Sequence, residues 1–433
     1  MNAIGQPRQF CALGGQQTVA AIERAIPIIH AGPGCSNKIF GALAHCNGFQ
    51  GSGYAGGNAI PSTNATETEV VFGGERRLRE VIDGALQVMD GDLFVVLTGC
   101  TADLVGDDVP AVVAEYRRRG APILHVSTGG FKGYANWGHE QVVLAIVDQL
   151  LEPAPRQERL VNVWSVLPYQ DPFWAGNLQA LGELLRSIGL APNLLFGHAS
   201  GGLAAWRKIP AAAFNLVVSP WPGLDIARRL EDRFGTPWLH QPVVPIGAVE
   251  TSAFLRAVGS FADVDVEPVV EREEARFYHY LDRSADFFLE MRWDLPSRFS
   301  CVADSFYSIG ASRFLANELG LLPGPQFVTD NPPEERQPAL RALFETLPGK
   351  PAVHFTPDSG HIADVLRAAA GADRHPLILG SSWDRDLARE LNGFHLSLSL
   401  PANNRLVLDR AYAGYAGGLR LMEDIYTGIL AKY

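Results

Sequence analysis

Short apolar runs alternate along the chain with segments that carry helix signals. The run 93–97 is wholly apolar and leads directly to Gly99 and Cys100, as expected for a buried strand that ends in a turn. Segment 108–120 begins with Asp108, a favourable N-cap, and ends with a glycine, so it predicts a helix. A second apolar run, 121–127, predicts another strand. This alternation favours parallel sheets with helices on both faces.

The same pattern recurs twice more. A second block follows the polar, proline-bearing segment 151–159 and ends in a charged stretch, 270–295, that predicts a helical connector. A third block begins at Arg298 and closes with a helix at the C-terminus. We therefore expect an α/β protein of three doubly wound, Rossmann-like domains with mostly parallel sheets. The predicted domains are 1–155, 156–295 with the connector included, and 296–433.

Composition and charge narrow the class of protein. Of the 433 residues, 47% are hydrophobic and 19% are charged, which is typical of a folded globular chain. The formal net charge of −11 would repel a phosphate backbone, so we expect no nucleic-acid partner. No apolar run is long enough to cross a bilayer, and the N-terminal residues lack an apolar signal core. We expect a cytoplasmic protein with no membrane partner.

The five cysteines are the most informative residues: Cys11, Cys35, Cys46, Cys100 and Cys301. An odd number in a large, cytoplasmic chain argues against a disulfide framework. Three of them, Cys11, Cys35 and Cys100, lie beside glycine or in a glycine-rich turn. Because ligands of open α/β sheets bind outside the carboxyl ends of the strands, we expect at least Cys35 and Cys100 to share one rim.

Glycine-flanked thiols favour a bulky inorganic ligand. Glycine lets the backbone approach such a ligand, and its N–H can bond to sulfur. Thiolates select soft metals and iron–sulfur clusters, whereas the long spacings without a C-x-x-C pair disfavour a zinc ribbon. The alternative that spacing alone leaves open is that these are buried structural cysteines.

One dinucleotide-binding motif is present but in an unsuitable context. Gly51–Gly56 reads G-x-G-x-x-G, a motif whose mechanism requires a preceding strand and a following helix. The flanking residues here are loop-like, so we expect a surface loop. The P-loop, H-E-x-x-H and G-x-S-x-G motifs do not occur in the sequence.

The first third of the chain resembles the catalytic component of nitrogenase and its relatives. The resemblance rests on four stretches in matching order: Ile28–Cys35, Thr66–Leu78, Thr98–Asp108 and His125–Gly133. It implies that Cys11, Cys35 and Cys100 hold half of an iron–sulfur cluster, an [8Fe-7S] P-cluster type shared between an α-type and a β-type subunit. A [4Fe-4S] cluster is the alternative. The resemblance also implies an α2β2 assembly and electron supply by a homodimeric, ATP-dependent iron protein.

The resemblance further implies which subunit this is. Ser219 stands where the α-type subunit carries the cysteine that holds its metallocofactor, so we expect a β-type subunit of a nitrogenase-like two-component reductase. Gly130 stands where the nitrogenase β-type serine would be, which favours a relative such as methylthio-alkane reductase. Reduction of dinitrogen, or a scaffold role in metallocofactor assembly, are the alternatives. A metal-free small-molecule-binding protein is a third class.

The remaining candidates have simpler expected roles. Cys301 is expected to be a buried strand thiol and Cys46 a structural one, although its closeness to Cys35 leaves an accessory ligand role open. Asp107 and Asp108 are expected mainly to cap a helix. Ser219 is expected to terminate its strand.

Overall fold

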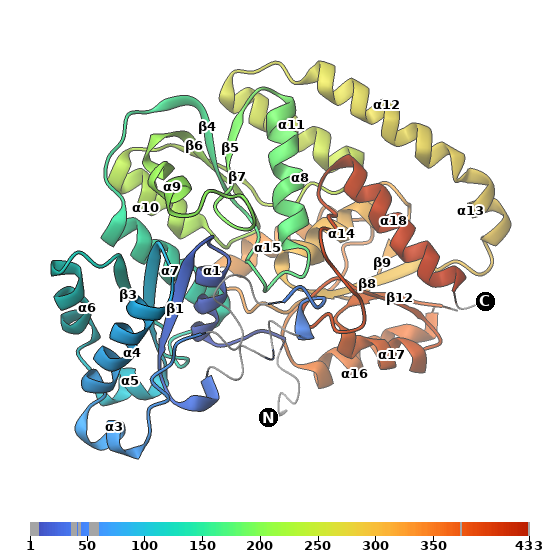
Figure 1. Cartoon of the computed structure of the whole chain (residues 1–433). Coiled ribbons are helices and arrows are strands. Elements are labelled where there is room, and N and C mark those ends of the chain that lie inside the picture. The colour runs from blue at the N-terminus through green and yellow to red at the C-terminus, as the bar shows by residue number, and fades with distance from the viewer. Residues whose placement is uncertain (1–7, 36–40, 42–44, 52–59, 373–374, 432–433) are drawn as a thin grey trace.

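The computed structural model of the chain describes residues 8–35, 41, 45–51, 60–372 and 375–431 (Figure 1). Its described strands form three sheets, and every strand pair in them is parallel. The expected α/β class with parallel sheets is therefore confirmed. Residues 52–56 of the G-x-G-x-x-G motif lie outside the described ranges.

The first sheet has the order β1-β2-β3, with strands Ala25–His30, Leu93–Thr98 and Ile123–Ser127. Its helices are α1 (Gly15–Ala20), α3 (Glu67–Phe72), α4 (Glu75–Val88), α5 (Cys100–Val105), α6 (Val109–Arg118) and α7 (Ala135–Leu150). Asp108 accepts a hydrogen bond from the Ala111 N–H and so caps α6, as the sequence predicts.

Successive strand residues face opposite sides of this sheet. Val95 and Leu97 pack in a core with the apolar residues of α1 and α7. Phe94 and Val96 pack in a separate core with α4 and α6. Helices thus cover both faces, as a doubly wound unit requires.

The second sheet has the order β5-β4-β6-β7. Its strands are Ala191–Asn193, Gln157–Trp164, Ala212–Val218 and Trp238–Gln241, and its helices are α8 (Trp174–Ser187), α9 (Gly202–Arg207), α10 (Leu224–Phe234) and α11 (Gly247–Ala262). The predicted connector consists of two helices, α12 (Glu267–Arg283) and α13 (Ala285–Met291), which run along the outside of the molecule (Figure 1).

The third sheet has the order β11-β10-β8-β12-β13, and β9 also pairs with β8. Its strands are β8 (Arg298–Ala303), β9 (Leu322–Pro323), β10 (Gln326–Val328), β11 (Val353–Phe355), β12 (Leu377–Gly380) and β13 (Phe394–Ser397). Its helices are α14 (Ser305–Asn317), α15 (Gln337–Phe344), α16 (Ser359–Ala369), α17 (Arg385–Glu390) and α18 (Gly414–Leu430).

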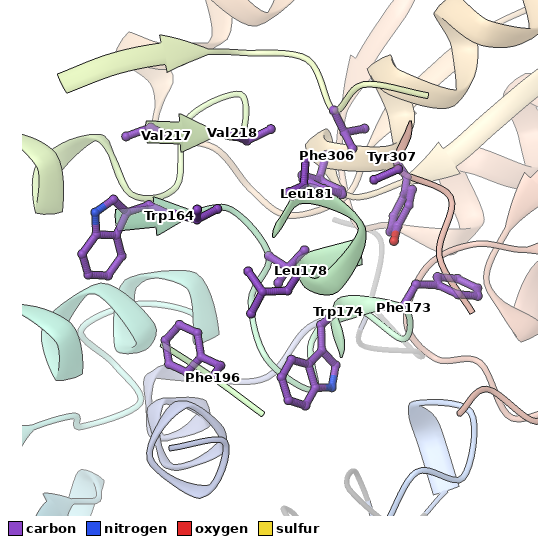
Figure 2. Packing of buried hydrophobic residues seen from close by; sticks show 14 of the residues in the cluster. Trp164, Phe173, Trp174, Leu178, Leu181, Phe196, Val217, Val218, Phe306 and Tyr307 are labelled. Carbon is purple, nitrogen blue, oxygen red and sulfur yellow. The ribbon is translucent and has the colours of Figure 1, made fainter. Parts of the chain in front are cut away.

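The three sheets fall within the three predicted domain ranges, but their cores are continuous. One hydrophobic cluster draws residues from all three. Figure 2 shows part of it, where Tyr307 of the third block lies near Phe173 of the second. The C-terminal helix α18 packs against α11 and α12 of the second block. The boundaries near 155 and 295 stay a prediction.

No helix in the described part of the chain combines the length and the apolar composition that crossing a membrane requires.

Candidate functional site

The carboxyl ends of β1 and β2 bring Cys35 and Cys100 to one edge of the first sheet. The two strands pair in parallel, with His30 opposite Thr98, and Cys100 is the first residue of α5. The Gly99 N–H donates a hydrogen bond to the His30 carbonyl at 2.9 Å. A Cβ at Gly99 would lie 2.5 Å from the Ala31 Cβ, so only glycine allows the two turns to approach this closely.

A separate chain segment delivers Cys11 to the same place. Cys11 pairs with Tyr134 in an antiparallel bridge, and the Ala12 N–H donates to the Gly133 carbonyl at 2.9 Å. The short 3-10 helix Ala12–Gly14 then packs on α7 at a glycine. A Cβ at Gly138 would lie 1.9 Å from the Ala12 carbonyl oxygen. The loop from β3 to α7 therefore fixes the position of Cys11.

Gly130, in that same loop, joins two of the cysteines. Its N–H donates to the Cys100 Sγ at 3.1 Å. A Cβ at Gly130 would lie 3.2 Å from the Cys100 Sγ and 3.3 Å from the Cys11 Sγ, so both sulfurs border the same backbone position. The third sulfur, of Cys35, lies 3.7 Å from where a Cβ of Gly99 would be, one residue before Cys100.

The donor set suits a soft, multinuclear group better than a single ion. Cys11 and Cys100 are exposed, Cys35 is half-buried, and none of the three forms a disulfide. Within the described ranges, no three His, Cys, Asp or Glu side chains gather closely enough to hold one metal ion. A cluster differs because each thiolate binds its own iron, and a backbone N–H to sulfur is a usual feature of such sites. By this criterion, the three cysteines and the backbone N–H of Gly130 fit an iron–sulfur cluster.

Asp107 contacts a different helix from the one that Asp108 caps. Its Oδ2 accepts a hydrogen bond from His30 Nε2 at 2.8 Å, and its Oδ1 accepts one from the Gly74 N–H at 2.8 Å. His30 is completely buried at the end of β1, and its Nδ1 lies 3.2 Å from Thr63 Oγ1. Asp108 therefore caps α6 as expected, whereas Asp107 binds the N-cap residue of another helix, α4, together with His30. Asp107 instead ties the β1 edge to the junction of α3 and α4.

Exposed apolar side chains surround this edge. We call Val71, Phe72, Leu104 and Phe131 the apolar rim; their exposed fractions are 70, 82, 73 and 58%. They belong to α3, to α5, which packs against α3, and to the loop that carries Gly130. Such a patch beside exposed thiols marks a protein–protein contact surface.

The other sequence candidates lie elsewhere. Ser219 is buried at the end of β6, where its hydroxyl donates to the Pro222 carbonyl, so it terminates the strand as predicted. Cys301 is fully buried in β8, and this burial raises the pKa of its thiol. Burial also raises the pKa of the Cys46 thiol, and the Cys46 carbonyl accepts from the Ala402 N–H of the third block. These contacts suit structural roles.

Sequence reasoning missed His30, Thr63 and Asp103 as parts of this edge. Only His30 had a local signal, because it closes a buried strand five residues before Cys35. The loop residues that bind Asp103 and the side-chain partners of Asp107 lie 24 to 77 residues away in the sequence, so no local pattern reveals them.

Comparison with known proteins identifies the family of the chain. The chain matches the family model of nitrogenase component 1 type oxidoreductases over residues 11–430. It is 23% identical to the nitrogenase molybdenum-iron protein beta chain of Methanococcus maripaludis, over 100% of this chain and 96% of the relative. It is 28% identical to one of the subunits of the light-independent protochlorophyllide reductase of Bradyrhizobium sp., over 56% of this chain and 47% of the relative.

Among solved structures, nitrogenase Cp1 at pH 6.5 superposes with a TM-score of 0.79 at 18% identity. The alignment covers 100% of this chain and 93% of that one. At this identity, it shows that the fold is similar and nothing more. The family match begins at Cys11, the first of the three cysteines, and extends through α18. The chain therefore belongs to the nitrogenase component 1 type oxidoreductases.

Proposed function

We propose that this chain is the β-type subunit of a nitrogenase-like two-component reductase and that Cys11, Cys35 and Cys100 hold half of a shared iron–sulfur cluster. The observation that carries the proposal is the gathering of two exposed thiols around Gly130, with the third beside Gly99. Three thiolates on an open face supply part of a ligand set, and a partner supplies the rest. The proposed cluster is of the [8Fe-7S] P-cluster type, with [4Fe-4S] as the alternative.

Such a cluster would supply one-electron relay chemistry. This chain's own contribution is ligation by the three thiolates, with the Gly130 N–H stabilising negative charge on the Cys100 sulfur. The glycines at 99 and 130 keep the space that the thiolates need, because a side chain at either position would approach its neighbours too closely.

Substrate chemistry is assigned to the α-type partner because the position beside Ser219, where the resemblance places the α-type metallocofactor, offers little room for such a group. The cavity that Ser219 lines, where the three blocks meet, has a volume of about 50 Å³. Pockets that bind small molecules usually hold ~300–1,000 Å³. Ser219 already has a hydrogen-bond acceptor in Pro222, and a hydroxyl is a poor ligand for a soft iron–sulfide group.

The proposed partners are an α-type subunit, in an α2β2 assembly, and a homodimeric ATP-dependent iron protein. The names of the nitrogenase and reductase relatives support a subunit of a larger enzyme. The apolar rim supports a protein partner at the cluster face, because single-chain surfaces rarely expose so many large apolar side chains together. We propose a cytoplasmic location for the complex.

For the substrate we propose methylthio-alkanes. The support is Gly130. The family resemblance places it where the nitrogenase β-type sequence carries a serine, so at this position the chain differs from dinitrogen-reducing enzymes. The partial identity to the protochlorophyllide reductase relative favours a second candidate, a reductase of a tetrapyrrole ring. Dinitrogen reduction and a scaffold role in cofactor assembly are further alternatives.

The test is anaerobic co-purification of this chain with its α-type partner. We expect a brown α2β2 complex with iron and sulfide bound, and turnover only when the iron protein and ATP are added. Ethyl methyl sulfide, dinitrogen and protochlorophyllide, supplied separately, distinguish the substrates. A complex that carries iron but reduces none of them supports the scaffold role. A colourless complex without iron contradicts the cluster proposal.

A further inference from the structure

One carboxylate oxygen binds three groups in and at the start of the loop from β3 to α7. Asp103 Oδ2 accepts hydrogen bonds from Ser127 Oγ at 2.8 Å and from the Gly129 N–H at 3.0 Å. The Lys132 ammonium lies 2.7 Å from the same oxygen and also donates to Ser127 Oγ. Three donors of one loop thus converge on one acceptor.

Asp103 is well suited to this role. It lies on α5, one turn after Cys100, and its side chain is only 7% exposed. Burial raises the pKa of its carboxyl, but hydrogen bonds from Lys132, Thr98 and Ser127 outweigh that effect and lower the pKa below its usual value. The group is therefore an ionised acceptor at neutral pH.

The loop that Asp103 holds carries the donor to a cluster ligand. The Gly130 N–H that reaches the Cys100 sulfur lies between Gly129 and Lys132, both bound to Asp103. A second link, between Thr98 and Thr128, joins the bases of the two turns, two residues before Gly130. The same loop pairs with Cys11 at Tyr134.

We infer that Asp103 is a positioning residue that holds the Gly130 N–H on the Cys100 sulfur and thereby raises the reduction potential of the bound cluster. The inference rests on the proposed cluster. A hydrogen bond to a ligand sulfur stabilises the more negatively charged, reduced form, so its loss lowers the potential.

The test uses a variant that leaves the net charge unchanged. Replacing Asp103 alone would leave Lys132 unpaired, and its positive charge would itself raise the potential. The double variant D103N/K132Q removes both charges together. Asp108→Asn is the matched control: it lies on the same segment, is exposed, does not touch the loop, and keeps an N-cap side chain.

Two measurements on the purified complex separate the possible outcomes. Hydrogen exchange of the 128–133 amides is expected to speed up about tenfold in D103N/K132Q, the factor for a lost hydrogen bond of ordinary strength. A mediated redox titration followed by EPR is expected to give a lower midpoint potential at unchanged iron content. Asp108→Asn should match the wild type in both measurements.

Unchanged exchange, or an unchanged potential at full iron content, would overturn the inference while leaving the cluster proposal intact. Absence of iron from the wild-type complex would instead defeat the proposed function. If the double variant does not assemble, Ser127→Ala removes one of the three donors. It should shift exchange and potential in the same directions by smaller amounts, and wild-type values there would overturn the inference.

Discussion

At the scale of single residues, the site depends as much on glycine as on cysteine. Cys301 shows that a cysteine in an apolar strand is not by itself a ligand candidate, because its side chain is completely buried within β8. Gly99 and Gly130 create the space beside the other thiols, and each would bring a Cβ within 3.2 Å of another side chain. The glycine context of the cysteines, together with the family resemblance, is what points to this candidate site in the sequence.

Removing one thiolate should remove the cluster. We expect Cys35→Ala or Cys100→Ala to lose most of the bound iron and the broad visible absorption, because this chain would then keep only two of its three thiolate ligands. Association of the two chains should weaken as well, since a shared cluster cross-links them. Iron analysis and analytical ultracentrifugation are the measurements. Cys301→Ala is the control thiol deletion and should keep its iron; full iron content in both test variants would contradict the ligand assignment.

For Ser219 we expect the opposite result, namely that its replacement leaves the bound iron in place. Because its hydroxyl contacts only the Pro222 carbonyl among the described residues, Ser219→Ala should cost about 1 kcal/mol of folding free energy and leave iron content unchanged. Denaturant unfolding and iron analysis test this. Loss of iron from this variant would mean that a metal group is anchored here, and it would reverse the β-type assignment.

At the scale of elements, the sequence predicted what is locally encoded. The strand 93–97 and the capped helix after Asp108 are confirmed because their signals lie within each element. Helix α7 is not among the helices that the apolar pattern indicates. It buries Asn136, His139 and Glu140 along with its apolar residues, so its packing against neighbouring elements hides the usual polar face.

The contact between α7 and the segment after Cys11 allows a test of whether the packing of these two elements positions Cys11. Gly138→Ala would bring a methyl group within 1.9 Å of the Ala12 carbonyl oxygen, so we expect a loss of about 1–3 kcal/mol from overpacking. Because that segment carries Cys11, iron content should fall although no ligand is altered. Gly84→Ala, in a helix with nothing near its Cβ, should instead be neutral or stabilising. Equal thermal stability and iron content in the two variants would refute this account.

At the scale of the whole molecule, the blocks are joined by contacts that no sequence pattern announces. Arg8 forms a buried ion pair with Asp384 at 2.7 Å, which ties the N-terminal segment to the third block across most of the chain. Trp221 of the second block donates to Asp330 of the third at 3.0 Å. The repeated strand–helix pattern predicts three units, but it does not predict which residues pair between them. For that reason the sequence predicts the number of sheets better than the way they join.

Buried carboxyl groups at this junction predict a pH-dependent stability. Burial, followed by the charge of a neighbouring carboxylate, raises the pKa of Asp171 in the second block and of Asp304 in the third. Near Asp304 lie Tyr307, whose hydroxyl donates to Asp171 at 2.8 Å, and Ser399. A carboxyl with a raised native pKa keeps its proton where the unfolded chain has lost it. The native state then binds more protons, so stability falls as pH rises above about 4 toward the raised native value.

We therefore expect the free energy of unfolding to decrease in that window by up to about 1.4 kcal/mol per pH unit for each proton that the native state retains. Asp304→Asn should flatten the dependence and stabilise the protein at the alkaline end, since the amide mimics the protonated group and still caps α14. Asp358→Asn, at the partly exposed N-cap of α16, should leave the slope unchanged. Denaturant titrations from pH 5 to 9, a range chosen to lie above the ordinary carboxyl pKa of about 4, measure the slopes. A slope that Asp304→Asn does not reduce would show that Asp304 is ionised in the folded protein and that other contacts compensate its charge.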